Sequence, residues 1–182
     1  MNKLLVVVDF QNDFIDGALG TPEAQAIVPN VVEKVKNWDG DIIFTADTHG
    51  ENYMQTNEGK HLPVVHCVHD TDGWELSKEV AEIVKNKMDV DTFQKNTYIK
   101  HTFGSVDLME RICADGYDYV EFIGLCTDIC VASNAIMLKA FCPGIQIVVD
   151  PTCCAGVTPD THAAALTTMK MCQIDILEDS ND

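Results

Sequence analysis

Short, solidly apolar runs alternate along this chain with segments whose apolar residues recur at helical spacing. The first run covers residues 4–8, and the first helical pattern covers residues 28–38, just before a glycine. Uninterrupted β-branched runs typify strands buried on both faces, whereas apolar residues spaced by three and four typify one face of a helix. The alternation predicts an α/β fold, a three-layer sandwich with a mostly parallel, Rossmann-like sheet and helices on both faces.

The same patterns place the other elements. The remaining predicted strands cover residues 41–46, 92–100, 119–125, 145–149 and 174–177, and the remaining predicted helices cover 75–86, 107–114, 128–141 and 159–171. Residues 47–74 show no clear periodicity, and a long irregular stretch in a compact domain is usually functional. Residues 178–182 are expected to form a frayed acidic end. Because no repeat or linker interrupts the pattern, we expect a single domain over residues 1–182.

Composition narrows the choice of partners. The 182 residues include 12 Lys or Arg and 29 Asp or Glu, for a net charge of −17. Such a charge repels phosphate backbones and anionic membrane surfaces, which excludes nucleic acid and membranes as expected partners. The chain has no apolar run of about 18 residues, and its first run is too short for a signal peptide. We therefore expect a cytoplasmic protein, and a charge of this sign carries no electrostatic penalty for a small neutral substrate.

The eight cysteines allow disulfides, metal sites or thiol chemistry. In a cytoplasmic protein, reduced thiols are the expected state. No two Cys-x-x-Cys pairs are present, which argues against a structural zinc knuckle.

Residues whose side chains could take part in catalysis follow three of the predicted strands. Ligands bind at these strand ends in folds of this type. Asp9 directly follows the first strand, and Lys100 ends the strand at 92–100, with Lys95 as the competing lysine. Cys130 falls in the first turn of the helix that follows strand 119–125. The positive end of that helix would lower the pKa of the thiol and could bind an oxyanion.

Each of these residues also has an ordinary structural interpretation. An aspartate after a strand commonly caps a turn, a free cysteine commonly packs in the core, and a lysine is normally solvated. Thr127 or Asp128 is expected to cap the helix that carries the cysteine.

The irregular stretch contains residues suited to a metal. Asp47 and His49 are two residues apart, so both side chains can point to one ion, and His66 follows later. Two histidines and a carboxylate suit Zn, Mn or Fe and describe an open, catalytic site, although histidines in a surface loop remain the alternative. Other candidates are present along this stretch, namely Glu58, His61 and His69.

Two motifs and their order resemble a known family. The motifs are Val6-Val7-Val8-Asp9-Phe10-Gln11-Asn12-Asp13-Phe14 and Gly124-Leu125-Cys126-Thr127-Asp128-Ile129-Cys130-Val131. With them the chain resembles, nearly end to end, the isochorismatase-like cysteine hydrolases, and within these the nicotinamidase/pyrazinamidase branch. The resemblance implies a triad with Asp9 as base, Lys100 as lysine and Cys130 as nucleophile. Lys100 is preferred to Lys95 because it leads into an aromatic residue and small residues at 103–105.

The resemblance also implies a divalent metal, with zinc the first expectation and manganese or iron open. Asp47, His49 and His66 match the family's metal positions, and Glu58 resembles an additional ligand. A cis peptide bond is implied between Leu125 and Cys126. It would direct the backbone N–H of Cys126, beside that of Cys130, toward an oxyanion.

The chain departs from the family at two places. Cys126 stands where alanine is common, and no aromatic residue occurs at 62–65, where nicotinamidases often carry one. Phe14 and Phe103 remain candidate walls for a substrate ring.

The function expected from the resemblance is a metal-containing cysteine amidohydrolase. Its substrate would be nicotinamide, converted to nicotinate and ammonia through a Cys thioester in pyridine-nucleotide (NAD) salvage. The alternatives are an amidase for another small amide or carbamoyl compound, and a thiol sensor or interaction module without enzymatic activity. Family members are usually dimers or higher oligomers, so a homo-oligomer, dimer or tetramer, is expected.

Overall fold

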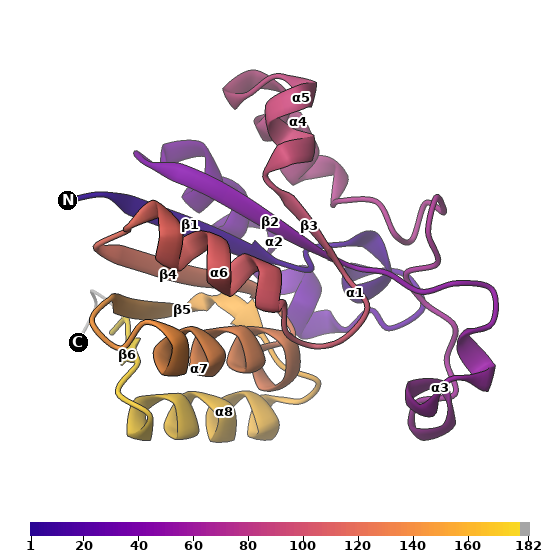
Figure 1. The fold of residues 1–182 in the computed structure, drawn as a ribbon. Helices are drawn as coiled ribbons and strands as arrows, with labels where there is room; N and C mark the ends of the chain where they lie inside the picture. The colour runs from indigo at the N-terminus through magenta and orange to yellow at the C-terminus, as the bar shows by residue number, and fades with distance from the viewer. Residues whose placement is uncertain (179–182) are drawn as a thin grey trace.

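The computed structural model, which describes residues 1–178, contains a six-stranded parallel sheet (Figure 1). Its strands are β1 (Lys3–Val8), β2 (Asp41–Asp47), β3 (Thr97–Lys100), β4 (Tyr119–Leu125), β5 (Gln146–Ala155) and β6 (Asp175–Ile176). Their order is β3-β2-β1-β4-β5-β6, and every neighbouring pair is parallel. The central position of β1 brings the carboxyl ends of β2 and β4 to either side of its own.

Helices cover both faces of this sheet. They are α1 (Asn12–Ile15), α2 (Pro22–Asn37), α3 (Asn57–His61), α4 (Lys78–Lys87), α5 (Val90–Lys95), α6 (Val106–Asp115), α7 (Ala132–Phe141) and α8 (Pro159–Met171), with a 3₁₀ turn η1 (Tyr53–Gln55) and a π-helical turn η2 (Thr127–Val131). In Figure 1, α6, α7 and α8 lie in front of and below β4 and β5, whereas α2 lies behind the sheet. None of the helices within residues 1–178 is long and apolar enough to cross a membrane.

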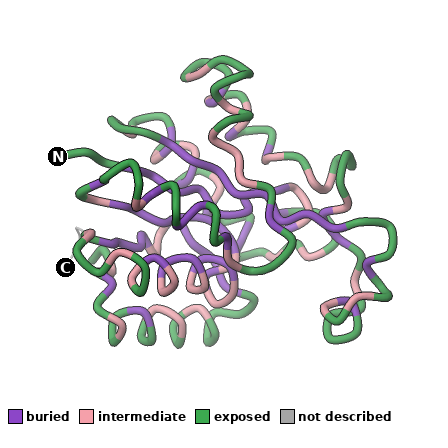
Figure 2. Tube along the Cα trace, viewed as in Figure 1, coloured by how far each residue is buried: buried purple, intermediate pink, exposed green. Residues whose placement is uncertain are grey.

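The core divides into two layers because successive strand residues point to opposite faces. Leu4, Val6 and Val8 of β1 pack with α6, α7 and α8, whereas Leu5 and Val7 pack with α1, α2 and α4. Figure 2 shows β1, β2, β4 and most of β5 as buried segments between more exposed helices, whereas the edge strands β3 and β6 are less buried. The predicted fold class, a parallel sheet between two helical layers, is confirmed.

Several predicted boundaries differ from the structure. The strand expected at 92–100 is helix α5 followed by the four-residue strand β3, because the Asp89 carboxylate caps α5 by accepting from Thr92 N at 2.8 Å. The first helix begins at Pro22 rather than at residue 28, since Thr21 caps it and proline is favoured in the first turn. The helix expected at 75–86 begins at Lys78, after its cap Ser77.

Other differences extend or divide an element. The helix expected at 128–141 is η2 followed by α7, and β5 continues past the predicted residue 149 to Ala155. The irregular stretch contains η1 and α3, and α1 was not predicted. The last strand is shorter than expected, and residues 179–182 of the expected acidic end lie outside the described residues.

The expectation that all cysteines are reduced is wrong for two of them. Cys113 of α6 and Cys142 at the end of α7 form a disulfide, with Cα atoms 6.2 Å apart. This bond does not follow from the expected compartment, because it depends on how α6 packs beside α7. The other six cysteines are free thiols.

Candidate active site

Three strand ends bring the predicted triad together. Asp9 follows β1, Lys100 is the last residue of β3, and Cys130 lies in η2 after β4. The Nζ atom of Lys100 is 2.6 Å from Asp9 Oδ2 and 3.5 Å from Cys130 Sγ. All three residues are buried, whereas the competing Lys95 is exposed in α5. The geometry therefore selects Lys100 as the lysine of this cluster.

Burial dominates the protonation of the cluster. It raises the pKa of the Cys130 thiol well above its ordinary value, and Asp9 raises it further while Lys100 lowers it. Burial also raises the pKa of Asp9, against the opposing effect of Lys100. For Lys100, burial favours the neutral amine, but Asp9, Cys130 and Asp47 outweigh it and raise the pKa. Burial and Asp9 thus oppose the thiolate expected from the helix terminus alone, and the thiol needs a neighbouring base.

The Asp9 carboxylate is arranged to receive a proton. Its Oδ1 atom accepts a hydrogen bond from Thr45 Oγ1 at 2.6 Å. Its Oδ2 atom lies against the Lys100 ammonium, yet among residues 1–178 it is the one buried side-chain oxygen or nitrogen without a properly aligned hydrogen bond. Asp9 has a φ of 43°, a left-handed conformation that is uncommon for a residue other than glycine and that turns the chain sharply at the end of β1.

The segment around the nucleophile differs in its capping from the prediction. No side chain caps the N-terminus of η2, where Cys126 is the preceding residue. The Asp128 carboxylate instead accepts from Val157 N at 3.2 Å, and Thr127 Oγ1 pairs with His162 Nδ1 at 2.8 Å. The prediction that Thr127 or Asp128 caps the helix is therefore wrong, because these two side chains hold the loop before α8 and α8 itself.

The cis peptide bond implied by the resemblance is present between Leu125 and Cys126. Burial raises the pKa of Cys126 to about 12. Cys126 packs with the core layer of α2, whereas Cys130 packs with that of α6, α7 and α8. The two thiols therefore belong to opposite sides of the sheet.

Four predicted metal ligands converge beside the triad. One ligand atom from each of Asp47, His49, Glu58 and His66 lies within 4.8 Å of the others. His49 Nε2 is 2.9 Å and His66 Nε2 is 3.5 Å from Asp47 Oδ2, and His49 Nε2 is 3.7 Å from Glu58 Oε1. The ring of His66 is oriented through its Nδ1 atom, which donates to Val64 O at 2.8 Å and leaves Nε2 as the ligand atom.

This set of two imidazoles and two carboxylates fits Zn, Mn or Fe. His49 and His66 hold the pKa of Asp47 well below its usual range, outweighing burial, so Asp47 is an anion ready to bind a cation. The other two candidates in this stretch, His61 and His69, are exposed and lie outside the cluster. Asp47 also lies 3.5 Å from Lys100 Nζ, which joins the ligand set to the triad.

Sequence reasoning missed two residues that support the metal ligands. The Gln11 side chain donates to Asp47 O at 2.9 Å and accepts from Asp47 N at 2.8 Å, so it fixes the backbone of that ligand. Tyr53 is fully buried, and its ring centre is 4.6 Å from that of His49 and 5.0 Å from that of His66. Gln11 lies within the opening motif, which was a usable signal, whereas Tyr53 lies in the stretch without periodicity.

The two predicted substrate walls lie in different surroundings. Phe14 is buried with its ring 5.6 Å from that of His66, whereas Phe103 is 45% exposed in the loop after β3. Trp74 is a further aromatic near the ligand set, since its indole N–H donates to Thr48 Oγ1 at 2.8 Å.

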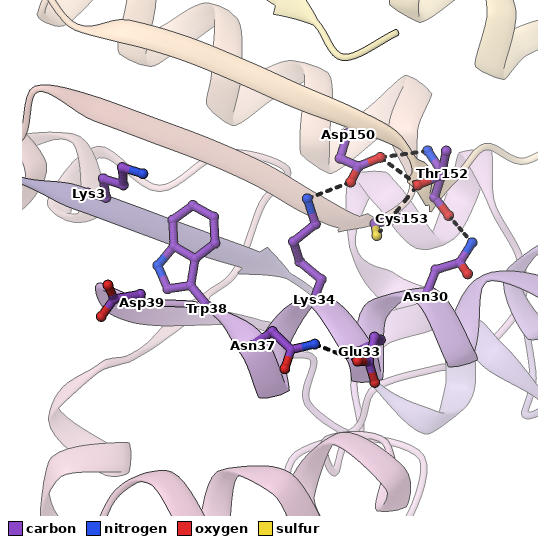
Figure 3. A pocket seen from close by; sticks show the side chains of 10 residues that line it. All are labelled: Lys3, Asn30, Glu33, Lys34, Asn37, Trp38, Asp39, Asp150, Thr152 and Cys153. Carbon is purple, nitrogen blue, oxygen red and sulfur yellow. Dashed lines mark hydrogen bonds and ion pairs between the residues drawn. The ribbon is translucent and has the colours of Figure 1, made fainter. Parts of the chain in front are cut away.

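Two open cavities lie away from the triad. One, of about 560 Å³, lies between α2 and strands β1 and β5 (Figure 3). The other, of about 580 Å³, lies between α1, α2 and the start of α4. At the first cavity, Lys34 Nζ is 2.6 Å from Glu121 Oε1 and 2.7 Å from Asp150 Oδ2. This second lysine cluster, in which Lys34 is partly exposed, was not predicted.

Known proteins share this sequence pattern and architecture. A nicotinamidase/pyrazinamidase of Mycobacterium tuberculosis is 27% identical over 190 residues, covering 96% of this chain and 98% of that protein. The crystal structure of nicotinamidase/pyrazinamidase PncA from Bacillus subtilis matches with a TM-score of 0.84 at 26% identity, covering 98% of this chain and 100% of that one. A pyrazinamidase of Pyrococcus horikoshii in complex with zinc matches with a TM-score of 0.78 at 26% identity, again over 98% and 100%.

The match to a family model extends over almost the whole described chain. The model of the isochorismatase domain matches residues 3–178, which include the triad and all four ligand residues. On that match, the chain belongs to the isochorismatase domain family.

Proposed function

We propose that this protein is a metal-containing cysteine amidohydrolase and that its substrate is nicotinamide, which it converts to nicotinate and ammonia. The observation that carries the proposal is the position of the Lys100 ammonium, 2.6 Å from Asp9 and 3.5 Å from the Cys130 thiol, beside a four-residue ligand set. Similar proteins named nicotinamidase/pyrazinamidase support the substrate class.

In the first half of the proposed reaction, Asp9 accepts the thiol proton as Cys130 Sγ attacks the carboxamide carbon. The protonated Lys100 stays between the two groups and offsets the negative charge of the carboxylate and sulfur. The backbone N–H groups of Cys126 and Cys130 hold the tetrahedral oxyanion. The C–N bond then breaks, and ammonia leaves with the proton that Asp9 returns.

In the second half, water is deprotonated by Asp9 and attacks the thioester. The C–O bond forms, the C–S bond breaks, and Asp9 returns the proton to Cys130 Sγ, which completes the cycle. Because burial raises the pKa of Asp9, its carboxyl group is suited to both accepting and donating a proton.

Asp47, His49, His66 and Glu58 would hold the metal. When bound, a divalent ion with an open position supplies a Lewis acid that can bind a pyridine nitrogen or orient water. The chain itself fixes two of these ligands. The Gln11 side chain holds the backbone of Asp47, and the carbonyl oxygen of Val64 orients the ring of His66. Phe14 and Phe103 are proposed to line the substrate ring.

Ammonia release tests the proposal. Purified protein is assayed on nicotinamide, pyrazinamide and small aliphatic and carbamoyl amides, with and without a chelator. We expect release from nicotinamide that Cys130→Ala abolishes and that Cys153→Ala, which removes another buried free thiol, leaves intact. Ammonia release from an aliphatic amide alone would show that nicotinamide is not the substrate. Ammonia release by Cys130→Ala would contradict the assignment of Cys130 as the nucleophile.

If no amide is hydrolysed while Cys130 reacts with oxidants, the thiol-sensor alternative gains support. The homo-oligomer, the cytoplasmic location and the role in NAD salvage stay predictions. Sedimentation of the purified protein would test the first of them.

A further inference from the structure

The strands alone do not fix Lys100 relative to Cys130. Lys100 ends β3, the edge strand, whereas Cys130 follows β4, and both β2 and β1 lie between them. Neighbouring strands are about 4.8 Å apart, so β3 and β4 are separated by roughly 14 Å. The 3.5 Å contact between Nζ and Sγ therefore depends on how the loop after β3 is attached to the helix that carries the nucleophile.

One amide side chain makes that attachment. Asn134 lies in α7, four residues after Cys130, and is fully buried. Its Nδ2 atom donates to Cys130 O at 2.8 Å and to Phe103 O at 3.1 Å, and its Oδ1 atom accepts from Ser105 N at 3.0 Å. Both N–H donors and the carbonyl of the amide are thus used, a combination that only asparagine or glutamine offers.

The loop held by Asn134 also holds the lysine. Lys100 Nζ donates to Thr102 O at 3.1 Å, within the same loop. At Gly104 the loop lies so close to α7 that a Cβ atom would be 2.4 Å from Met137 Cε. Loop residues 102–105 therefore contact the Lys100 ammonium on one side and α7 on the other.

We propose that Asn134 is a positioning residue that keeps the Lys100 ammonium against the Cys130 thiol. It acts through the loop at 102–105 and touches neither the thiol nor the substrate. The proposal rests on the proposed function only in that Cys130 is taken as the reacting thiol. Its test uses the reactivity of that thiol directly and needs no amide turnover.

The variant Asn134→Ser should remove the bonds from Asn134 to the loop while keeping its bond to Cys130 O. A serine in a helix can donate to the carbonyl four residues earlier, so it keeps a bond to Cys130 O but loses both bonds to the loop. We expect alkylation of Cys130 by iodoacetamide, followed by mass spectrometry of its peptide, to slow by roughly 10- to 100-fold, the range for a displacement of about 1 Å. In turnover, kcat should fall by a similar factor with little change in KM.

A double-mutant cycle with Lys100→Met decides whether Asn134 acts through the lysine. We expect Asn134→Ser to change alkylation less than twofold once Lys100 is methionine. An equal slowing in both backgrounds would show a merely structural role, and wild-type reactivity of Asn134→Ser would remove the role altogether. Either result overturns the proposal. Absence of amide turnover in the wild type would contradict the proposed function and leave this cycle interpretable.

Asn96→Ala is the matched control. The Asn96 amide donates to Ile42 O at 3.2 Å and lies just before β3, at the end remote from Lys100. Its loss removes a side-chain to backbone bond at the same edge strand without touching the loop. We expect Cys130 alkylation within twofold of the wild type in this variant, and a slowing equal to that of Asn134→Ser would overturn the positioning role.

Discussion

Two lysine ammonium groups each lie between two carboxylates, one buried and one partly exposed, and the buried one also contacts a nucleophile. Lys100 lies between Asp9 and Asp47, and Lys34 lies between Glu121 and Asp150. In both clusters burial favours the neutral amine, and the neighbouring carboxylates raise the lysine pKa above its ordinary value, for Lys100 together with Cys130. The direction of the pKa shift therefore does not distinguish the two, although the Lys100 side chain is 1% exposed and that of Lys34 is 23% exposed.

The difference lies in what the remaining polar atoms contact. At the Lys34 cluster, Tyr119 OH donates to Glu121 Oε2 at 2.7 Å, and Thr152 donates to Asp150 Oδ1 from its backbone and its hydroxyl. At the Lys100 cluster, Asp9 Oδ2 is paired with the ammonium at 2.6 Å, and the ammonium also contacts a thiol. A cluster without a reactive group holds elements together, whereas a carboxylate and an ammonium beside a thiol can move a proton.

Replacing each lysine by methionine should show the functional difference between the two clusters most clearly. We expect Lys100→Met to lower kcat/KM for the hydrolysed amide by roughly 1,000-fold or more, since it removes the charge beside the attacking sulfur. Lys34→Met should keep kcat/KM within twofold. Steady-state ammonia release measures both, and similar losses in the two variants would show that the clusters do not differ in function.

Metal loss should also affect only the Lys100 side of the molecule. We expect His66→Ala to purify with little zinc, manganese or iron by elemental analysis, and the wild type and Lys34→Met to carry equal amounts. Since a ligand that binds the folded state stabilises it by about 2.7 kcal/mol at 100 times its Kd, added zinc should raise the melting temperature of the apo wild type. An equal rise for His66→Ala would contradict the ligand assignment.

The comparison also explains what the sequence could reveal. The Lys100 cluster was predictable because Asp9 and Cys130 follow apolar strand patterns and lie in motifs, and parallel strands end at one edge. Lys34 lies in a regular helical pattern, and the register that brings Glu121 and Asp150 under it depends on strand pairing that no local pattern shows. The sequence pattern alone therefore could not reveal that cluster.

Asn134 and Tyr53 were missed for related reasons. Asn134 matters through contacts with a loop about 30 residues away, and Tyr53 lies in a stretch where hydrophobic periodicity is absent. The fold class followed from periodicity, but the boundary of β3 did not, because the Asp89 cap overrode the apolar spacing of the residues after it. Local patterns predicted elements, and tertiary contacts fixed their ends.

The Lys34 cluster should contribute to stability although activity does not need it. Breaking a buried ion pair by removing one partner costs about 3–5 kcal/mol, and because the Lys34 side chain is 23% exposed at the groove we expect about 2–3 kcal/mol for Lys34→Met. The double variant Lys34→Met/Glu121→Gln should recover about 1 kcal/mol, since it leaves one fewer unpaired charge. Urea unfolding measures both, and an unchanged midpoint for Lys34→Met would show that the cluster does not hold α2 to the sheet.

The smallest expected effect is the pH dependence of that loss. The Lys34 ammonium and Thr152 hold the pKa of Asp150 below its ordinary value of 3.8, outweighing burial. Stability from a group whose pKa is lowered on folding is fully present above the unfolded value and is lost as pH falls through the folded one. The difference in unfolding free energy between the wild type and Lys34→Met should therefore be constant from pH 7 to about pH 5 and then shrink, by roughly 0.5–1 kcal/mol near pH 3. Because the net charge of −17 in the wild type becomes more negative by only one in Lys34→Met, the difference between the two removes most of the effect of overall charge repulsion. A loss that stays constant down to pH 3 would mean that Lys34 does not stabilise the fold through the ionised Asp150.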